Sequence, residues 1–369
     1  MVTKKSTTNW MSSRAFGGFV CALALAAATG CRSREAIGEL APADIETTLL
    51  MIGDAGEADP REREVVLDSM TAHAQAAPGR TVIVFLGDNV YPAGIPEEGR
   101  AEYADARRRL AAQVNAVPRG ARGIFVPGNH DWANSEAFGL YSVRLQERMI
   151  TSLAQGKDIR MLPGNGCPGP VSFDTGRTRL IVLDTQWWLH SYIVRDSLSN
   201  CGSNTSAEVT ANLRREVADT RDGRLTFVAG HHPLMTGGTH GGYCGITAPF
   251  RRFGGRSQDI TSSQNRTMRD SIEAAFTANP PLAYAAGHEH NLQVLRGGPA
   301  VRYLLVSGAG SQAKTGCGVW MRESYHVTQR RSGFMRVDIL RGRGALLRVF
   351  HYSGSGDGGM AYSRWLELR

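Results

Sequence analysis

Short apolar runs alternate with longer amphipathic stretches over most of the chain, and apolar runs dominate its last third. Several of these runs contain almost no polar residue and end in Gly and Asp, as expected for strands that are buried on both faces. They predict strands over 48–56, 81–88, 123–131, 171–175, 178–185, 224–233, 281–290, 291–298, 300–308, 333–340 and 345–354. Helical periodicity with polar or proline boundaries predicts helices over 61–79, 98–117, 136–155, 206–220 and 261–279.

This order of elements indicates an α/β fold. Strands and helices alternate first and strands follow one another later, which is typical of sheets whose faces are covered by helices. The hydrophobic content of 42% is enough to build a large core. No Pro-, Gly- or Ser-rich linker divides residues 47–369, so we expect one domain there.

The N-terminal end has the features of an export signal. A basic start precedes 14 apolar residues over 15–28, too few to span a membrane well. Small residues directly before Cys31 resemble the bacterial lipobox, in which the cysteine is lipidated. We therefore expect residues 1–30 to be a lipoprotein-type signal peptide and residues 31–46 a tether. Lipid on Cys31 would anchor the exported protein in the outer membrane or facing the periplasm, and a plain secretory signal is the alternative.

The net charge of the chain excludes few classes of binding partner. The formal net charge is +8 and falls to +5 without residues 1–30, which carry three Lys/Arg and no Asp/Glu. A modest positive charge favours anionic substrates or membrane surfaces. The sequence contains no basic tract interleaved with aromatic residues, so we do not expect a nucleic-acid partner.

Polar side chains gather where five of the predicted strands end. They are Asp54, Asp88 with Tyr91, Asn129 with His130, His231 with His232, and His288 with His290. Loops at the carboxyl ends of strands form the binding crevice of open α/β sheets. Each motif alone has an ordinary explanation, because Gly-Asp is common in turns and a single His is common in cores. Together, carboxylates, an amide, imidazoles and a phenol are a ligand set for two transition metals.

The motifs GDAG, GDNVY, GNHD, VAGHHP and GHEH resemble the five blocks of the calcineurin-like metallophosphoesterases. Tyr91, three residues after Asp88, makes the chain similar to the purple acid phosphatase branch. The segments GDNVYPAGI, GHEHNLQVL and VSGAGS resemble its small, tartrate-resistant type. The resemblance covers about residues 47–352. It implies an α/β/β/α sandwich of two mixed β-sheets flanked by helices.

The resemblance also implies a binuclear metal centre. A ferric ion would be held by Asp54, Asp88, Tyr91 and His290. A divalent ion (Fe, Zn or Mn) would be held by Asp88, Asn129, His231 and His288, so that Asp88 bridges the two. A phenol with a pKa near 10 would bind iron as phenolate, because a trivalent cation stabilises the ionised form.

The expected activity is hydrolysis of a small-molecule phosphomonoester by metal-bound hydroxide, as in an acid phosphatase. His130 would contact the phosphoryl oxygens. His240, nine residues after His231, would be the general acid that protonates the leaving oxygen, and a loop histidine without a role is the alternative. His232 would pack or orient its loop. The competing functions are a phosphodiesterase or nucleotide hydrolase on the same metals, and a non-catalytic phosphate-binding lipoprotein.

Four cysteines remain once Cys21 and Cys31 are assigned to the signal and the lipobox. An even number in an exported protein suggests two disulfides, with three connectivities. We favour Cys167–Cys201 and Cys244–Cys317. The loop over 237–245 carries His240 and five glycines, and such a loop is entropically costly to order. A bond from Cys244 to Cys317 would hold it near the last of the five strand ends.

Overall fold

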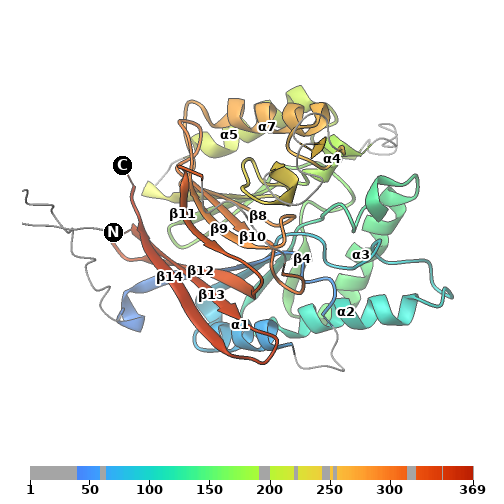
Figure 1. Ribbon diagram of the computed structural model, residues 1–369, viewed down its shortest axis with the longest axis horizontal. Helices are drawn as coiled ribbons and strands as arrows, with labels where there is room; N and C mark the ends of the chain where they lie inside the picture. Colours follow the sequence, from blue (N-terminus) through green and yellow to red (C-terminus); the bar gives the residue numbers. More distant parts are fainter. Residues whose placement is uncertain are drawn as a thin grey trace, which may run out of the picture. The chain divides into compact units, whose positions relative to one another are not determined.

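Two seven-stranded sheets form the centre of the fold (Figure 1). The computed structural model describes residues 40–58, 64–190, 200–219, 223–242, 250–251, 256–313, 321–342 and 344–368. The predicted signal peptide, Cys31 and most of the tether lie outside the described residues, so the domain boundaries stay predictions.

The first sheet has the order β14-β13-β12-β1-β2-β3-β4. Its strands are β1 (Ile45–Ile52), β2 (Thr81–Phe85), β3 (Arg122–Phe125), β4 (Asp158–Met161), β12 (Ser332–Leu340), β13 (Gly344–Tyr352) and β14 (Gly358–Leu366). Strands β1 to β4 are parallel, whereas β12, β13 and β14 add to β1 in antiparallel fashion. The carboxyl ends of β1, β2 and β3 therefore lie at one edge of the sheet.

The second sheet has the order β11-β9-β10-β8-β7-β6-β5. Its strands are β5 (Val171–Thr175), β6 (Thr178–Val182), β7 (Leu225–Ala229), β8 (Ala283–Ala286), β9 (Leu292–Arg296), β10 (Tyr303–Ser307) and β11 (Ser324–Thr328). Strands β6, β7, β8 and β10 are parallel to their neighbours in this set. Both sheets are mixed, as predicted.

Helices cover the outer face of each sheet. The helices are α1 (Val65–Gln75), α2 (Tyr103–Asn115), α3 (Gly139–Ala154), α4 (Gln186–Leu189), α5 (Ser206–Ala218) and α7 (Ser263–Phe276). Short 3-10 turns occur at η1 (Pro42–Asp44), η2 (Pro78–Arg80), η3 (Ala133–Ser135) and η6 (Thr239–Gly241). Helices α1, α2 and α3 share a core with the first sheet, and α4, α5 and α7 share one with the second. Figure 1 shows α5 and α7 on the side opposite α1 and α2.

Strand β1 shows why the predicted strands are apolar throughout. Leu50 and Ile52 pack towards the helices, whereas Leu49 and Met51 pack into the core between the two sheets. Successive side chains of a strand point to opposite faces, so both faces of β1 are buried. The predicted α/β/β/α sandwich is therefore confirmed.

Several predicted boundaries were wrong. The helix predicted from residue 98 begins at Tyr103, because Gly99 has a φ of 93°, which a right-handed helix does not allow. The strand predicted over 123–131 ends at Phe125, shortly before Pro127, which cannot donate a ladder hydrogen bond. Strands β4, β11 and β14 were not predicted; β4 has only four residues and lies at a sheet edge.

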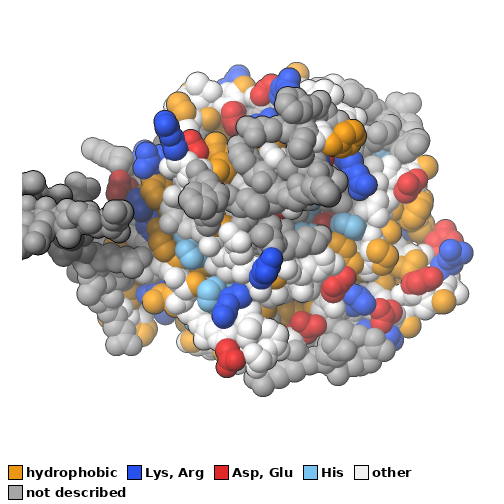
Figure 2. All heavy atoms as spheres, in the orientation of Figure 1, with side chains coloured by type: hydrophobic (Ala, Val, Ile, Leu, Met, Phe, Trp, Pro, Cys, Tyr) orange, Lys and Arg blue, Asp and Glu red, His pale blue; other side chains and the backbone are white. Residues whose placement is uncertain are grey.

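One of the two expected disulfides is present. Cys167 and Cys201 are bonded, which indicates an oxidising compartment. Cys244 and Cys317 lie outside the described residues, so their pairing stays a prediction. None of the helices in the described part of the chain is long and apolar enough to cross a bilayer. On the face drawn in Figure 2, basic and acidic side chains of the described residues are interspersed.

Candidate metal centre

The carboxyl ends of strands from both sheets meet at one place. The Gly53 amide at the end of β1 donates to the Ser307 carbonyl at the end of β10, at 2.7 Å. Within the first sheet, the Asp54 amide donates to the Gly87 carbonyl at 2.9 Å. These backbone bonds join the ends of β1, β2 and β10, which are far apart in the sequence, at one site.

The backbone at this site is strained. Asp54, Asp88 and His288 have φ values of 57°, 54° and 66°, in the left-handed region that non-glycine residues rarely adopt. Gly128 allows a further close approach, because a Cβ atom there would lie 2.3 Å from the Asp88 carboxylate. Such strain persists only where the surrounding structure imposes it, and it is concentrated at functional sites.

The four residues predicted to hold a ferric ion form one group. The Tyr91 hydroxyl lies 3.0 Å from Asp54 Oδ1, 3.3 Å from Asp88 Oδ2 and 3.1 Å from His290 Nε2. His290 Nε2 is also 3.2 Å from Asp54 Oδ1. All four side chains are buried, and Tyr91, the most exposed, is 8% accessible. Four ligand-type atoms thus face one another away from solvent.

The four residues predicted to hold a divalent ion form a second group. His231 Nε2 and His288 Nδ1 both lie 3.0 Å from Asn129 Oδ1, and they are 3.2 Å from each other. His231 Nε2 is also 3.4 Å from Asp88 Oδ2. The same Asp88 oxygen therefore faces both groups, as expected of a bridging carboxylate.

Backbone carbonyls orient the two imidazoles of the second group. His231 Nδ1 donates to the Leu86 carbonyl at 2.8 Å, and His288 Nε2 donates to the Gln258 carbonyl at 3.2 Å. A carbonyl only accepts hydrogen bonds, so the proton is fixed on the nitrogen that points away from the cluster. The other nitrogen of each ring faces Asn129. Metal-binding histidines are oriented by partners of this kind.

The electrostatics of the cluster also suit cations. Burial, and then the carboxylates of Asp54 and Asp88, hold the pKa of Tyr91 well above its usual value. Burial acts against ionisation of Asp88, but the charges of His231 and His130 hold its pKa well below the usual value. Burial lowers the pKa of His231, but Asp88 outweighs it and raises that pKa to about 9. A bound cation would replace the proton that balances Asp88.

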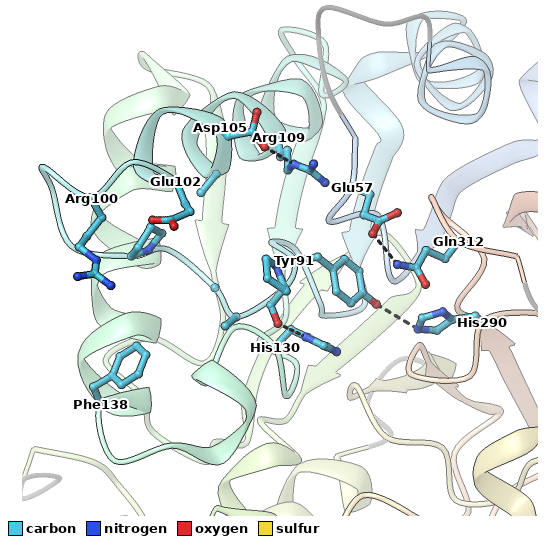
Figure 3. Close-up of a pocket in the computed structure, with 15 residues that line it drawn as sticks. Glu57, Tyr91, Arg100, Glu102, Asp105, Arg109, His130, Phe138, His290 and Gln312 are labelled. Atoms are coloured by element: carbon cyan, nitrogen blue, oxygen red, sulfur yellow. Dashed lines mark hydrogen bonds and ion pairs between the residues drawn. The ribbon is translucent and has the colours of Figure 1, made fainter. Parts of the chain in front are cut away.

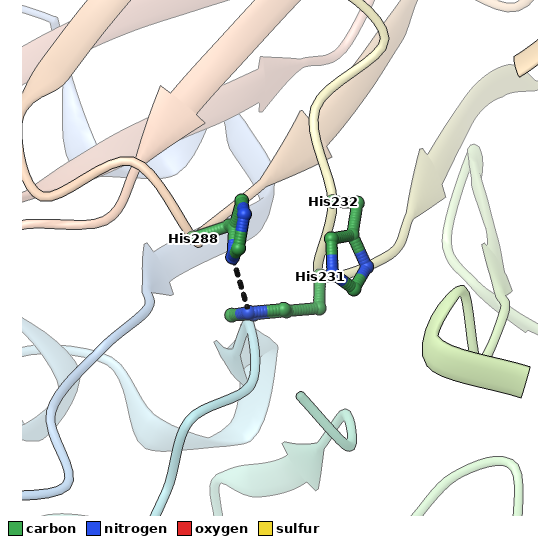
Figure 4. A group of neighbouring side chains, drawn as sticks. All are labelled: His231, His232 and His288. Atoms are coloured by element: carbon green, nitrogen blue, oxygen red, sulfur yellow. Dashed lines mark hydrogen bonds between the residues drawn. The ribbon is translucent and has the colours of Figure 1, made fainter. Parts of the chain in front are cut away.

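His232 lies close enough to His231 and His288 to be considered as a further metal ligand. Its ring lies beside those of His231 and His288, and ligand atoms of the three residues lie within 4.8 Å of one another (Figure 4). However, His232 Nδ1 is hydrogen-bonded to Thr185 Oγ1 at 2.9 Å and Nε2 to Gln258 Oε1 at 2.7 Å. Both nitrogens are therefore occupied by hydrogen bonds to side chains, and the role of orienting its loop stays a prediction for this residue.

The two predicted catalytic histidines differ from the ligand-type residues in exposure. The side chains of His130 and His240 are 26% and 25% accessible. His130 Nδ1 donates to the Pro92 carbonyl at 2.5 Å, and its Nε2 lies 3.9 Å from Asp88 Oδ2. The His240 ring packs 4.1 Å from that of His288, measured between centroids. Both residues line a cavity of about 550 Å³ that opens at the centre.

Asp131, for which the sequence suggested no role, joins the loops that follow β2 and β3. Its carboxylate is fully buried and accepts hydrogen bonds from the amides of Asn89 (2.9 Å), Val90 (3.2 Å) and Gly128 (2.8 Å). Burial, with a contribution from Asp88, raises the pKa of Asp131 to about 7. The sequence could have drawn attention to Asp131, because it lies two residues after Asn129 in the GNHD motif.

Two further acids hold His240 in place. Glu289, which is 1% accessible, accepts hydrogen bonds from the amides of Thr239 (2.8 Å) and His240 (2.9 Å). Asp259, which is fully buried, accepts from His240 Nδ1 at 2.9 Å. Alternation in GHEH could have shown that Glu289 points away from its two histidines. No sequence signal pointed to Asp259, because it lies in an irregular segment.

Comparison with known proteins identifies solved structures that have a similar fold. No protein-family profile and no curated protein sequence matches the chain. Solved structures of similar fold include "GAP50 the anchor in the inner membrane complex of Plasmodium", with a TM-score of 0.57, 15% identity, and coverage of 88% of this chain and 90% of that chain. They also include purple acid phosphatase PPD1 from yellow lupin (Lupinus luteus) seeds, with a TM-score of 0.55 and 14% identity, covering 86% of this chain and 53% of that chain. The chain shares its fold with a purple acid phosphatase. At these identities the likeness establishes the fold and not the reaction.

Proposed function

We propose that this protein is an exported, metal-dependent hydrolase of small-molecule phosphomonoesters. The observation that carries the proposal is the buried cluster in which two groups of ligand-type atoms face a shared oxygen of Asp88. The fold shared with a purple acid phosphatase supports the same chemistry. Carboxylates, imidazoles, an amide oxygen and a phenol suit two transition-metal ions rather than one.

The donor set fits the expected pair of metals. The ferric ion would be held by Asp54, Asp88, Tyr91 and His290. The divalent ion, Fe, Zn or Mn, would be held by Asp88, Asn129, His231 and His288. When bound, the two ions would supply Lewis-acid stabilisation of the phosphoryl charge and a water acidic enough to serve as nucleophile at mild pH. The phenol of Tyr91 favours a trivalent partner, because a strong positive field is needed to ionise a phenol.

The residues around the cluster have separate tasks. His130 donates through Nδ1 to Pro92, so its Nε2 is the atom left to bind a phosphoryl oxygen. His240 donates through Nδ1 to Asp259, so its Nε2 is the atom left to protonate the leaving oxygen. The Arg251 guanidinium, 2.9 Å from Asp259 Oδ1, offsets part of the carboxylate charge beside His240.

The test is metal analysis of purified protein together with a panel of phosphoesters from pH 4 to 8. We expect two metal ions per chain and hydrolysis of monoesters. His288→Ala should lose the divalent ion and lower kcat by roughly 10²-fold or more. His326→Ala is the matched control, because His326 is a half-buried histidine outside the cluster. Wild-type protein that contains both metals and hydrolyses no phosphoester would overturn the proposal.

A second candidate is a non-catalytic phosphate-binding lipoprotein. The observation in its favour is the similar fold of GAP50, which is described as the anchor in the inner membrane complex of Plasmodium. This candidate predicts that the metal-loaded protein binds inorganic phosphate without turning over any ester. The same panel, combined with phosphate-binding calorimetry, separates it from the hydrolase.

The proposed location is the outer membrane, through lipid on Cys31. The basic start, the short apolar stretch and the small residues before Cys31 support this location. The Cys167–Cys201 disulfide agrees with export, because such bonds persist in oxidising compartments. The proposed partners are a small phosphoester and the membrane, without nucleic acid.

A further inference from the structure

A cavity of about 650 Å³ opens on the Tyr91 side of the candidate centre. Tyr91, His130 and His290 form the wall nearest the proposed metals. Figure 3 shows these three side chains on one side of the cavity and Phe138 with Arg100 on the other. A group attached to a phosphorus atom at the centre could therefore extend into this cavity.

The walls of this cavity are mainly apolar. They include Pro92, Pro96, Ala106 and Phe138. The Phe138 side chain is 51% accessible, although most large apolar side chains of the protein are buried. An aromatic ring left exposed in the wall of a concave site is suited to contact a ligand. Because Tyr91 also presents a ring there, the cavity offers aromatic contacts on two sides.

The charged groups around the cavity do not favour a second anion. Arg109 Nε is paired with Asp105 Oδ2 at 2.9 Å. Glu57 Oε1 accepts from Gln312 at 2.7 Å, and Glu102 also lines the wall. Among the described residues that line the cavity, three acidic side chains thus accompany two basic ones, Arg100 and Arg109. A phosphate or carboxylate on the organic group would gain little here.

A second cavity at the centre, which His240 lines, has a different character. Its walls are polar and include His240, Gln258 and two arginines, Arg251 and Arg256. The two cavities share His130 and His290. A phosphoryl group at the centre would therefore have a polar, basic cavity on one side and an apolar, aromatic one on the other.

We infer that the cavity beside Tyr91 binds an uncharged aromatic group of the phosphoester substrate and that Phe138 determines this specificity. The inference rests on the proposed function, because it uses the metal centre as the site of the phosphoryl group. The aromatic group can come from two sources. It is either the leaving group of a monoester, in which case His240, which lines the other cavity, would not be its general acid, or the second ester group of a diester, whose leaving group would then occupy the cavity beside His240.

Binding of non-hydrolysable analogues tests the cavity independently of catalysis. Calorimetry on the metal-loaded protein would compare phenylphosphonate with methylphosphonate. We expect phenylphosphonate to bind more tightly, and Phe138→Ala to weaken its binding roughly 3- to 10-fold while changing methylphosphonate binding less than about 2-fold. Tyr141→Ala is the matched control, because Tyr141 is a 45% accessible aromatic residue on the adjoining helix α3 that does not line the cavity.

Kinetics then identify the source of the aromatic group. Phenyl phosphate is compared with methyl phosphate, and 4-nitrophenyl phenyl phosphate with 4-nitrophenyl methyl phosphate. For each substrate, kcat/KM of the variant is divided by kcat/KM of the wild type, so that differences in intrinsic reactivity between the substrates cancel. If Phe138→Ala lowers kcat/KM by 3- to 10-fold for phenyl phosphate alone, the cavity binds the leaving group. If the same loss is confined to 4-nitrophenyl phenyl phosphate, the cavity binds the second ester group.

The outcomes separate this inference from the proposed function. Phenyl-selective binding that depends on Phe138, without any turnover, would support the cavity and refute the hydrolase. Turnover combined with equal effects of Phe138→Ala on phenyl and methyl ligands would refute the cavity and leave the hydrolase standing. An equal effect of Tyr141→Ala would also refute the role assigned to Phe138.

Discussion

Replacing Glu289 by Gln should disable His240 without disturbing the proposed metal ligands. Glu289 Oε1 accepts from the Thr239 amide at 2.8 Å, and Oε2 accepts from the His240 amide at 2.9 Å and from Thr236 Oγ1 at 3.2 Å. Glutamine keeps the size of the side chain, but its NH₂ group must face one of these donors. If the amide oxygen stays with His240, the Thr239 amide loses its acceptor in a partly buried place.

The magnitude follows from that lost hydrogen bond. A buried donor left without an acceptor costs about 1–3 kcal/mol, and 1.4 kcal/mol corresponds to a factor of 10 in an equilibrium. The ordered position of the loop that carries His240 should therefore become less favourable by about 5- to 140-fold. If His240 is the general acid, kcat for an alkyl phosphate should fall by about that factor. The loss for 4-nitrophenyl phosphate should be smaller, because nitrophenolate needs little protonation.

The assay is a double-mutant cycle with His240→Ala, with metal content measured for each variant. We expect Glu289→Gln to have no further effect on kcat once His240 is removed, because it acts through that residue. The matched control is Glu208→Gln, since Glu208 accepts two backbone amides at the start of α5, away from the centre. Independent, multiplicative losses in the cycle, with unchanged metal content, would refute the assigned role of Glu289.

Three further predictions concern the metals and the membrane. Tyr91→Phe should abolish the tyrosinate-to-iron charge-transfer band of the oxidised protein while iron stays bound; an active, iron-loaded wild type without a visible band would exclude Tyr91 as a ligand. Metal affinity should rise by up to about tenfold per pH unit between pH 7 and 9, because Asp88 raises the pKa of His231 to about 9 and the metal must displace that proton. A chelator competition assay that shows no pH dependence would contradict this prediction. Cys31→Ser should release the protein from the membrane fraction, since lipid supplies the anchoring free energy; retention of the variant would disprove the lipobox.

Local patterns in the sequence were enough to locate the main strands and the residues at their ends. The run over 82–86 is apolar at every position, because both faces of such a strand are covered. The Gly-Asp and Gly-His motifs mark where these strands stop and polar side chains begin. A local pattern of this kind does not depend on distant partners, so the positions of the seven polar residues at the strand ends could be predicted from the sequence, whereas their roles as metal ligands stay predictions.

Other elements could not be predicted because their stability comes from neighbours. Strand β4 has four residues and alternates exposed and buried positions, and it exists because β3 supplies the parallel partner. Strand β14 is half-buried and begins with two glycines, and it is formed by antiparallel pairing with β13. Propensity is weak in such segments, and tertiary pairing decides them.

The assembly of the site is a property of the tertiary structure. The sequence could not show that Asp88 Oδ2 faces both groups, because these groups come from strands of two different sheets. It also did not indicate that Glu289 and Asp259 hold His240. The disulfide expected to hold the same loop lies outside the described residues and stays a prediction. Contacts between residues that are distant in the sequence depend on how the two sheets stack, and no local pattern of residues records that stacking.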